Sequence, residues 1–197
     1  MRLFSIIILA FLVFPSLTFA QKFNNDNTKY FGVAILDNKT TKKGKFKYHQ
    51  GSESIHFNDG TTLNANQTLY FQYYDDEQKL NHYYFSLKNK NGELGFYELL
   101  LNGKILLYKK DILVEKNHID THQTLITMNM GHIIEPKLYY IDNDTIQPLE
   151  LFEQDILPKM KGKMEQVSQY IVLNQLNMNF LADQITIIDY FNEIQEQ

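Results

Sequence analysis

Between residues 30 and 146, apolar and polar residues alternate or cluster in short runs that are typical of β-strands. Turn-forming Asp, Asn and Gly residues separate these runs. The predicted strands are residues 30–36, 45–49, 54–58, 61–63, 68–74, 82–87, 94–101, 104–109, 124–128, 137–141 and 145–146. Many short strands at regular spacing are typical of a sandwich or a barrel-like sheet of mostly antiparallel strands.

Two dipeptides that end in glycine predict tight hairpins. The Asp-Gly pair at 59–60 favours a type I′ turn, in which both central residues have a positive φ. The Asn-Gly pair at 102–103 predicts a two-residue turn between two long strand runs. In that register Glu98 lies opposite Leu107, and both faces of the hairpin are apolar near the turn. We therefore expect this hairpin to lie centrally in the sheet, with both faces covered.

After Pro148 the pattern becomes helical. Residues 149–157 suit a short helix that ends at Pro158. Two later stretches carry apolar residues at helical spacing, namely Met160, Met164, Val167 and Ile171, and then Leu181, Ile185, Ile188 and Phe191. The sequence therefore predicts an α+β protein with one domain over residues 21–197. Its β-rich part covers residues 21–147, and a C-terminal pair of short helices closes it over residues 148–197.

Residues 1–20 have the pattern of a secretory signal peptide. A short basic start precedes an apolar core, Pro15 breaks that core, and the small residue Ala20 ends the segment. The core is shorter than the roughly 20 apolar residues that a spanning helix needs. We expect cleavage after Ala20, which makes the mature chain a secreted or periplasmic protein without a transmembrane anchor.

Composition narrows the possible chemistry. The chain has no cysteine, which excludes disulfides, a thiolate nucleophile and a zinc–thiolate site. Arg2, inside the predicted leader, is its only arginine, so the mature chain lacks the guanidinium fork that binds phosphate. The formal net charge is −4, and carboxylates outnumber lysines most strongly in residues 142–197. An acidic chain of this kind is not expected to bind nucleic acid.

Lysines gather locally near the start of the strand region, at Lys39, Lys42, Lys43, Lys45 and Lys47. Such a cluster can contact an acidic polysaccharide or a lipid headgroup. The favoured interpretation is a solvated turn followed by an edge strand that lysines protect from pairing with other chains.

His118 and His122 are the strongest metal candidates. Histidines four apart on a helix can bind one metal ion, and Glu115 and Asp120 lie close in sequence. However, the metalloprotease pattern needs a glutamate directly after the first histidine, where this chain has Ile119. The segment also lies between two strand runs, so we favour a solvated loop.

Two acidic stretches have features of calcium sites. Residues 142–144 begin like a calcium loop, but Ile146 then occupies a ligand position and Pro148 interrupts the pattern. An Asx-rich β-turn explains this stretch better. Residues 75–77 form an acidic loop between two predicted strands, and solvation is again the favoured interpretation.

Glu98 is the carboxylate with the most unusual expected surroundings, because the predicted hairpin places it among apolar side chains. Burial alone would raise its pKa and fit it for general acid catalysis. Glycosidase chemistry usually needs a second carboxylate across a cleft, which the sequence does not identify. The favoured interpretation is a structural glutamate that pairs with a lysine or accepts backbone N–H bonds.

Some motifs along the chain resemble those of small exported proteins of Bacteroidota. These proteins have a leader, a strand-rich middle and a helical end. The matching motifs are Phe96-Tyr97-Glu98, Asn102-Gly103-Lys104, Leu107-Tyr108, Tyr139-Tyr140-Ile141, Pro148-Leu149, Gln169-Tyr170-Ile171 and Asp189-Tyr190-Phe191-Asn192. The resemblance covers residues 32–192 and implies export and this fold. It implies no activity and no site.

The sequence contains no nucleophile elbow, phosphate loop or dinucleotide-binding glycine motif. We therefore assign no catalytic, cofactor-binding or metal-ligating residue from sequence. The first hypothesis is a non-enzymatic exported protein that binds another cell-envelope component or has a structural role. The first alternative is a carrier of a small lipid or sugar in a pocket lined by the many tyrosines. The second alternative is an unrecognised hydrolase that uses Glu98 or a histidine.

Overall fold

A computed structural model describes the backbone of residues 29–117 and 130–195, and the side chains of residues 29–112 and 135–195. Three sequence predictions lie outside the described residues. They are the leader at 1–20 with its cleavage after Ala20, the strand at 124–128, and the metal candidates His118 and His122.

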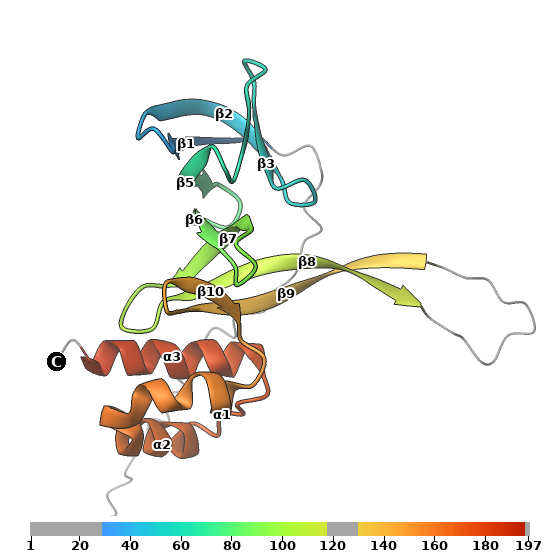
Figure 1. Cartoon of the computed structure of the whole chain (residues 1–197). Helices are drawn as coiled ribbons and strands as arrows, with labels where there is room; N and C mark the ends of the chain where they lie inside the picture. Colours follow the sequence, from blue (N-terminus) through green and yellow to red (C-terminus); the bar gives the residue numbers. More distant parts are fainter. Residues whose placement is uncertain (1–28, 118–129, 196–197) are drawn as a thin grey trace, which may run out of the picture.

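The described strands form one sheet in which all neighbours are antiparallel, in the order β10-β9-β8-β7-β6-β5-β1-β2-β3-β4. The strands are β1 (Tyr30–Leu36), β2 (Thr41–His49), β3 (Ser54–Phe57), β4 (Thr62–Asn64), β5 (Thr68–Asp75), β6 (Leu80–Lys88), β7 (Leu94–Leu101), β8 (Leu107–Asn117), β9 (Met130–Asp142) and β10 (Thr145–Pro148). The sheet is not closed (Figure 1). The predicted α+β class is confirmed, whereas the sandwich or barrel is not.

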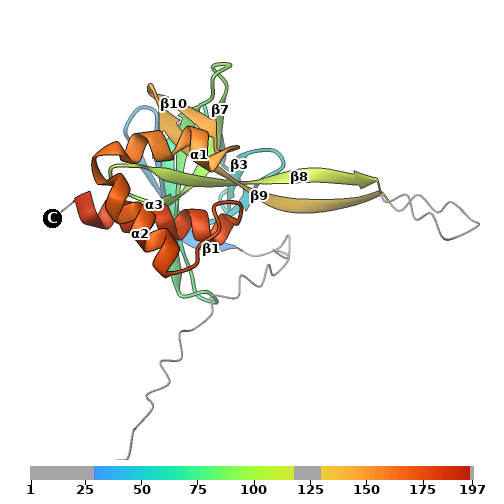
Figure 2. The ribbon, with the colours of Figure 1, turned by 90° about the horizontal axis from the view of Figure 1, so that it is seen from below.

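The C-terminal helices lie beside the β8–β10 end of the sheet, away from β2 and β3 (Figures 1 and 2). They are α1 (Phe152–Asp155), the 3-10 helix η1 (Leu157–Lys163), α2 (Met164–Leu173) and α3 (Leu181–Gln195). Pro158 does not end the helical region but lies in the first turn of η1, where its missing N–H costs no hydrogen bond. The helical end is therefore confirmed, with α3 longer than the short pair predicted.

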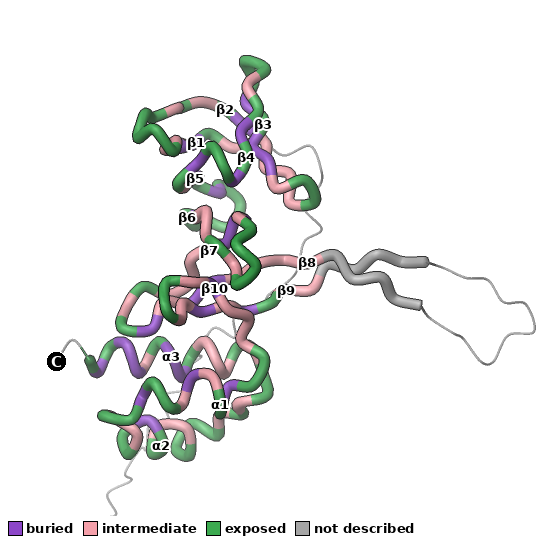
Figure 3. The backbone as a smooth tube through the Cα atoms, viewed as in Figure 1, coloured by how far each residue is buried: buried purple, intermediate pink, exposed green. Residues whose placement is uncertain are grey.

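Successive residues of a strand point to opposite faces, which gives this sheet two faces with different partners. On one face, here called the inner face, side chains of β1–β7 such as Phe46, Phe71 and Phe96 form an aromatic core. Also on the inner face, Leu107 and Tyr140 pack against the helices. The other face, here called the outer face, carries a smaller core around Tyr97 and Tyr108. Figure 3 shows buried positions in the strands and also in the helices beside the β8–β10 end.

Strands β8 and β9 continue beyond the rest of the sheet as a two-stranded extension (Figures 1 and 2). Their pairing runs from Leu107 opposite Tyr140 to Asn117 opposite Met130. The described pairing of β7 with β8 goes no further than Glu98 opposite Lys109. Beyond that point β8 diverges from β7.

The register of the β7–β8 hairpin differs from the prediction. Glu98 lies opposite Lys109 and not Leu107, because the connection spans 102–106 instead of two residues. Asn192 on α3 holds this longer connection, because its Oδ1 accepts a hydrogen bond from Ile105 N (2.9 Å) and its Nδ2 donates one to Ile105 O (2.9 Å). A Cβ on Gly103 would lie 2.5 Å from Asn192 Cγ, so only glycine fits beside this contact. The helix thus replaces the ladder partners that a tight turn would have supplied.

The type I′ turn lies at a different hairpin from the one predicted. At 57–61 the hairpin is present, but Gly60 N donates to Phe57 O and Gly60 alone of the central pair has a positive φ, at 87°. That pattern is a three-residue loop ending in a glycine bulge. The β9–β10 hairpin instead has two positive φ values in succession, 47° at Asn143 and 61° at Asp144. Those are the values a type I′ turn requires.

The lysine-rich strand β2 is not an edge strand, and that part of the prediction is wrong. It lies between β1 and β3 in the sheet. The lysines are accommodated because alternate residues face outward. Lys43 and Lys45 lie opposite Val33 and Phe31 on β1, and both are exposed.

Candidate functional site

Glu98 lies on the inner face of β7, where it is held by side chains from both neighbouring strands. Its Oε1 accepts a hydrogen bond from His82 Nδ1 on β6 at 2.5 Å. Its Oε2 lies 2.8 Å from Lys109 Nζ on β8 and accepts a longer bond from Tyr84 Oη at 3.4 Å. The Glu98 side chain is only 6% exposed. These donors offset part of the cost of taking the carboxylate out of water.

The partners reverse the expected direction of the pKa. Burial acts to raise the pKa of Glu98, but the hydrogen bond from His82 and the charge of Lys109 oppose it, and the net pKa is lowered. Burial acts to lower the pKa of Lys109, but Glu98 and then Asp111 hold it raised. Glu98 is therefore an ion at neutral pH. Its pairing with Lys109 agrees with the favoured prediction of a structural glutamate, and the alternative of a raised pKa is wrong. Glu98 cannot serve as a general acid in this state.

His82 is the residue of this cluster with an unsatisfied atom. Since a carboxylate only accepts, Nδ1 carries the proton that is donated to Glu98. The ring stacks on Tyr73, with centroids 4.9 Å apart. Its Nε2 is buried and has no hydrogen-bond partner among the described residues. His82 thus orients Glu98, and the rest of its ring lies in apolar surroundings. No role for His82 was predicted from the sequence.

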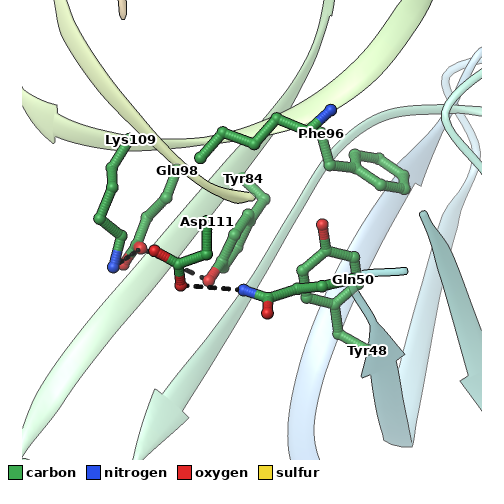
Figure 4. A pocket seen from close by; sticks show the side chains of 8 residues that line it. Tyr48, Gln50, Tyr84, Phe96, Glu98, Lys109 and Asp111 are labelled. Carbon is green, nitrogen blue, oxygen red and sulfur yellow. Dashed lines mark hydrogen bonds and ion pairs between the residues drawn. The ribbon is translucent and has the colours of Figure 1, made fainter. Parts of the chain in front are cut away.

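A small pocket opens beside this cluster (Figure 4). Its lining includes Glu98, Lys109 and Asp111, together with Tyr48 and Gln50 from the end of β2. Its volume is about 10 Å³, which is room for about one water molecule. Gln50 Nε2 donates to Asp111 Oδ2 at 3.1 Å and so ties the β2–β3 turn to β8. Asp111 is a second carboxylate near Glu98, but a sugar ring does not fit between them.

A second ion pair lies where β8 leaves β7. Glu53, in the β2–β3 turn, pairs with Lys110, and its Oε2 accepts a hydrogen bond from Phe96 N at 3.1 Å. The carboxylate thus satisfies a ladder N–H of β7 near the point where β8 diverges. The Lys110 ammonium also lies 4.8 Å from the centroid of the Tyr97 ring. These contacts hold the β2–β3 turn against β7 and β8.

The acidic stretches fold as turns. The carboxylate of Asp75 is buried and accepts hydrogen bonds from Glu77 N and Gln78 N, which is an Asx turn. Asp142 pairs with Lys159 at 2.5 Å and borders the type I′ turn. Within residues 29–112 and 135–195, the structure contains no group of three or more His, Asp or Glu side chains placed to hold a metal ion.

The exposed aromatic residues on the outer face of β1, β2, β5 and β6 were not predicted from the sequence. The tyrosines were expected to form the core or to line a pocket. Cross-strand pairing places Phe31 opposite Lys45, and Gln72 opposite Tyr83, so these residues share one face. Phe31 is 64% exposed, Tyr74 42% and Tyr83 39%. The alternation of Tyr, Gln and Tyr at positions 70, 72 and 74 was the available signal for this face.

Comparisons with known proteins give no further assignment. No family model, curated protein or solved structure matches the chain. Among the described helices, none is both long enough and apolar enough to cross a membrane.

Proposed function

We propose that this chain is a non-enzymatic exported protein that acts by binding another component of the cell envelope. The leader pattern at residues 1–20 and the resemblance to exported Bacteroidota proteins support the address. The observation that carries the binding role is the outer face of β1, β2, β5 and β6. Contiguous exposed aromatic side chains on a soluble protein mark interaction sites, and tyrosine is enriched in them.

The cluster around Glu98 and the pocket beside it give less support to a small-ligand carrier or to a hydrolase. A carrier of a lipid or sugar needs a cavity of roughly 300 Å³ or more. The pocket beside Glu98 measures about 10 Å³. A hydrolase that uses Glu98 as its general acid needs a protonated carboxyl group, whereas Glu98 is held ionised by His82 and Lys109.

The binding role is tested by sedimentation of purified mature protein with washed envelopes from its own host. The face variant is Tyr74→Ala/Tyr83→Ala. The matched control is Val172→Ala/Leu173→Ala, which removes a similarly exposed apolar pair from the end of α2, where Val172 is 74% and Leu173 80% exposed. Circular dichroism melts establish that all three proteins are folded.

We expect saturable sedimentation of the wild type and of the control, and a loss of apparent affinity of at least about thirtyfold in the face variant, since its two hot-spot aromatics cost more than about 1 kcal/mol each when truncated. Equal sedimentation of all three proteins, or none by the wild type, would overturn the proposal.

A further inference from the structure

We infer that the partner of the outer face is an acidic polysaccharide. This inference depends on the proposed binding role and names its partner class. Three features of the face support it: exposed aromatic rings, amide side chains between those rings, and a lysine-bearing strand at one side, with no carboxylate among the outward-pointing residues of β1, β2, β5 and β6.

The aromatic rings provide the flat apolar part of the site. Tyr74 and Tyr83 lie on adjacent strands at diagonal positions, because Gln72 is the residue directly opposite Tyr83. Farther along the same two strands, the Tyr70 and Phe85 rings stack with centroids 5.6 Å apart. A sugar ring has one face of C–H groups, which packs on an aromatic face while the hydroxyl groups remain at its edge.

The amides provide hydrogen-bonding groups for those hydroxyls. Gln72 lies opposite Tyr83, and Asn81 lies opposite Tyr74, so each exposed tyrosine has an amide side chain as its cross-strand neighbour. An amide both donates and accepts, as a sugar hydroxyl does. The same amides count against insertion into a lipid bilayer, because burying them without partners costs free energy.

The charge of the face gives the sign of the partner. Lys43 and Lys45 are exposed on β2 beside Phe31 and Val33 of β1. The outward-pointing residues of β1, β2, β5 and β6 include no carboxylate. Asp75, the last residue of β5, is buried on the inner face, and the other acidic residues near this face in the sequence lie in connecting loops. The chain as a whole is acidic, with a formal net charge of −4, so this positive surface is a local departure that favours an anionic partner.

The test is isothermal titration of the mature protein with an oligogalacturonate, and with the same oligomer fully methyl-esterified. The charge variant is Lys43→Gln/Lys45→Gln, and its matched control is Lys161→Gln/Lys163→Gln in η1, within the helical layer. The aromatic variant Tyr74→Ala/Tyr83→Ala is titrated in parallel. Phosphatidylglycerol vesicles serve as the anionic lipid probe.

We expect binding of the oligogalacturonate that weakens as salt is added, because exposed charges are screened. The charge variant should bind about tenfold more weakly, the aromatic variant at least as weakly, and the control like the wild type. Equal binding of the ester would overturn the acidic part of the inference. Binding to vesicles alone, or to neither oligomer, would overturn the inference entirely. In either case the proposed binding role stands if envelope sedimentation still depends on Tyr74 and Tyr83.

Discussion

Replacing Glu98 with glutamine should destabilise the protein although the side chain keeps its shape. The change removes the charge that faces Lys109 at 2.8 Å and turns one acceptor into a donor beside His82 and Lys109. Removing one member of a buried ion pair costs about 3–5 kcal/mol. Lys109 is 28% exposed, so water takes over part of its solvation, and we expect a loss of about 2–3 kcal/mol in the free energy of unfolding.

The pH dependence of that loss follows from the direction of the pKa shift. The pKa of folded Glu98 lies below its ordinary value of 4.5, because His82 and Lys109 outweigh burial. Below that ordinary value the unfolded chain takes up a proton before the folded chain does, so stability falls as the pH falls. Glu98 therefore contributes its full stabilisation above the unfolded pKa and loses it as the pH drops through the folded pKa.

Urea unfolding followed by circular dichroism measures both effects, at neutral pH and at about pH 3. Lys161→Gln, which neutralises an exposed lysine, is the control and should change the unfolding free energy by less than about 0.5 kcal/mol. The losses of unfolding free energy caused by Glu98→Gln and by Lys109→Met, each measured alone, should not add in the double variant, because the two residues share one interaction. A gap between wild type and Glu98→Gln below about 0.5 kcal/mol, or one that does not shrink in acid, would refute the reasoning.

Two further substitutions test the hairpins. Asn192→Ala should lower the unfolding free energy by about 2–4 kcal/mol, because it leaves the buried N–H and C=O of Ile105 without partners. Urea unfolding measures this change, and a value within about 0.5 kcal/mol would contradict the role assigned to Asn192. Asp144→Gly should raise the free energy of unfolding by about 0.5–1 kcal/mol, and with it the melting temperature, because glycine adopts the φ of 61° without strain. A lower melting temperature would show that the Asp144 side chain stabilises the turn.

Strand positions were predictable because they depend on local pattern. Residues 30–36 and 94–101 are unbroken runs of strand formers between turn residues, and β1 and β7 have those same bounds. The register of β7 with β8 was not predictable, because it is fixed by Asn192, which is 87 residues from Ile105 in sequence. The unusual environment of Glu98 was therefore foreseen, while its partner Lys109 required the true register.

The alternation at positions 70, 72 and 74 indicates a separate face of β5, but its exposure could not be predicted, for a different reason. Tyrosines point to both faces of β5. Tyr73 is buried on the inner face, and Tyr74 is exposed on the outer face. Composition is nearly the same on both sides of such a strand. Which face is covered depends on how the other strands and the helices pack, and that is a property of the whole chain.

Stability explains the Glu98 cluster but not the outer face. The carboxylate of Glu98 is buried, and its ion pair and hydrogen bonds compensate the lost water, so folding alone accounts for His82 and Lys109. Tyr74 and Phe31 leave much of their surface in water, where it contributes no burial energy to the isolated chain. Two exposed lysines on the neighbouring strand add positive charge to that surface in an otherwise acidic protein. An exposed aromatic surface that does not stabilise the fold is expected where a partner covers it, and Tyr74, Tyr83, Lys43 and Lys45 are the residues that such a partner would contact.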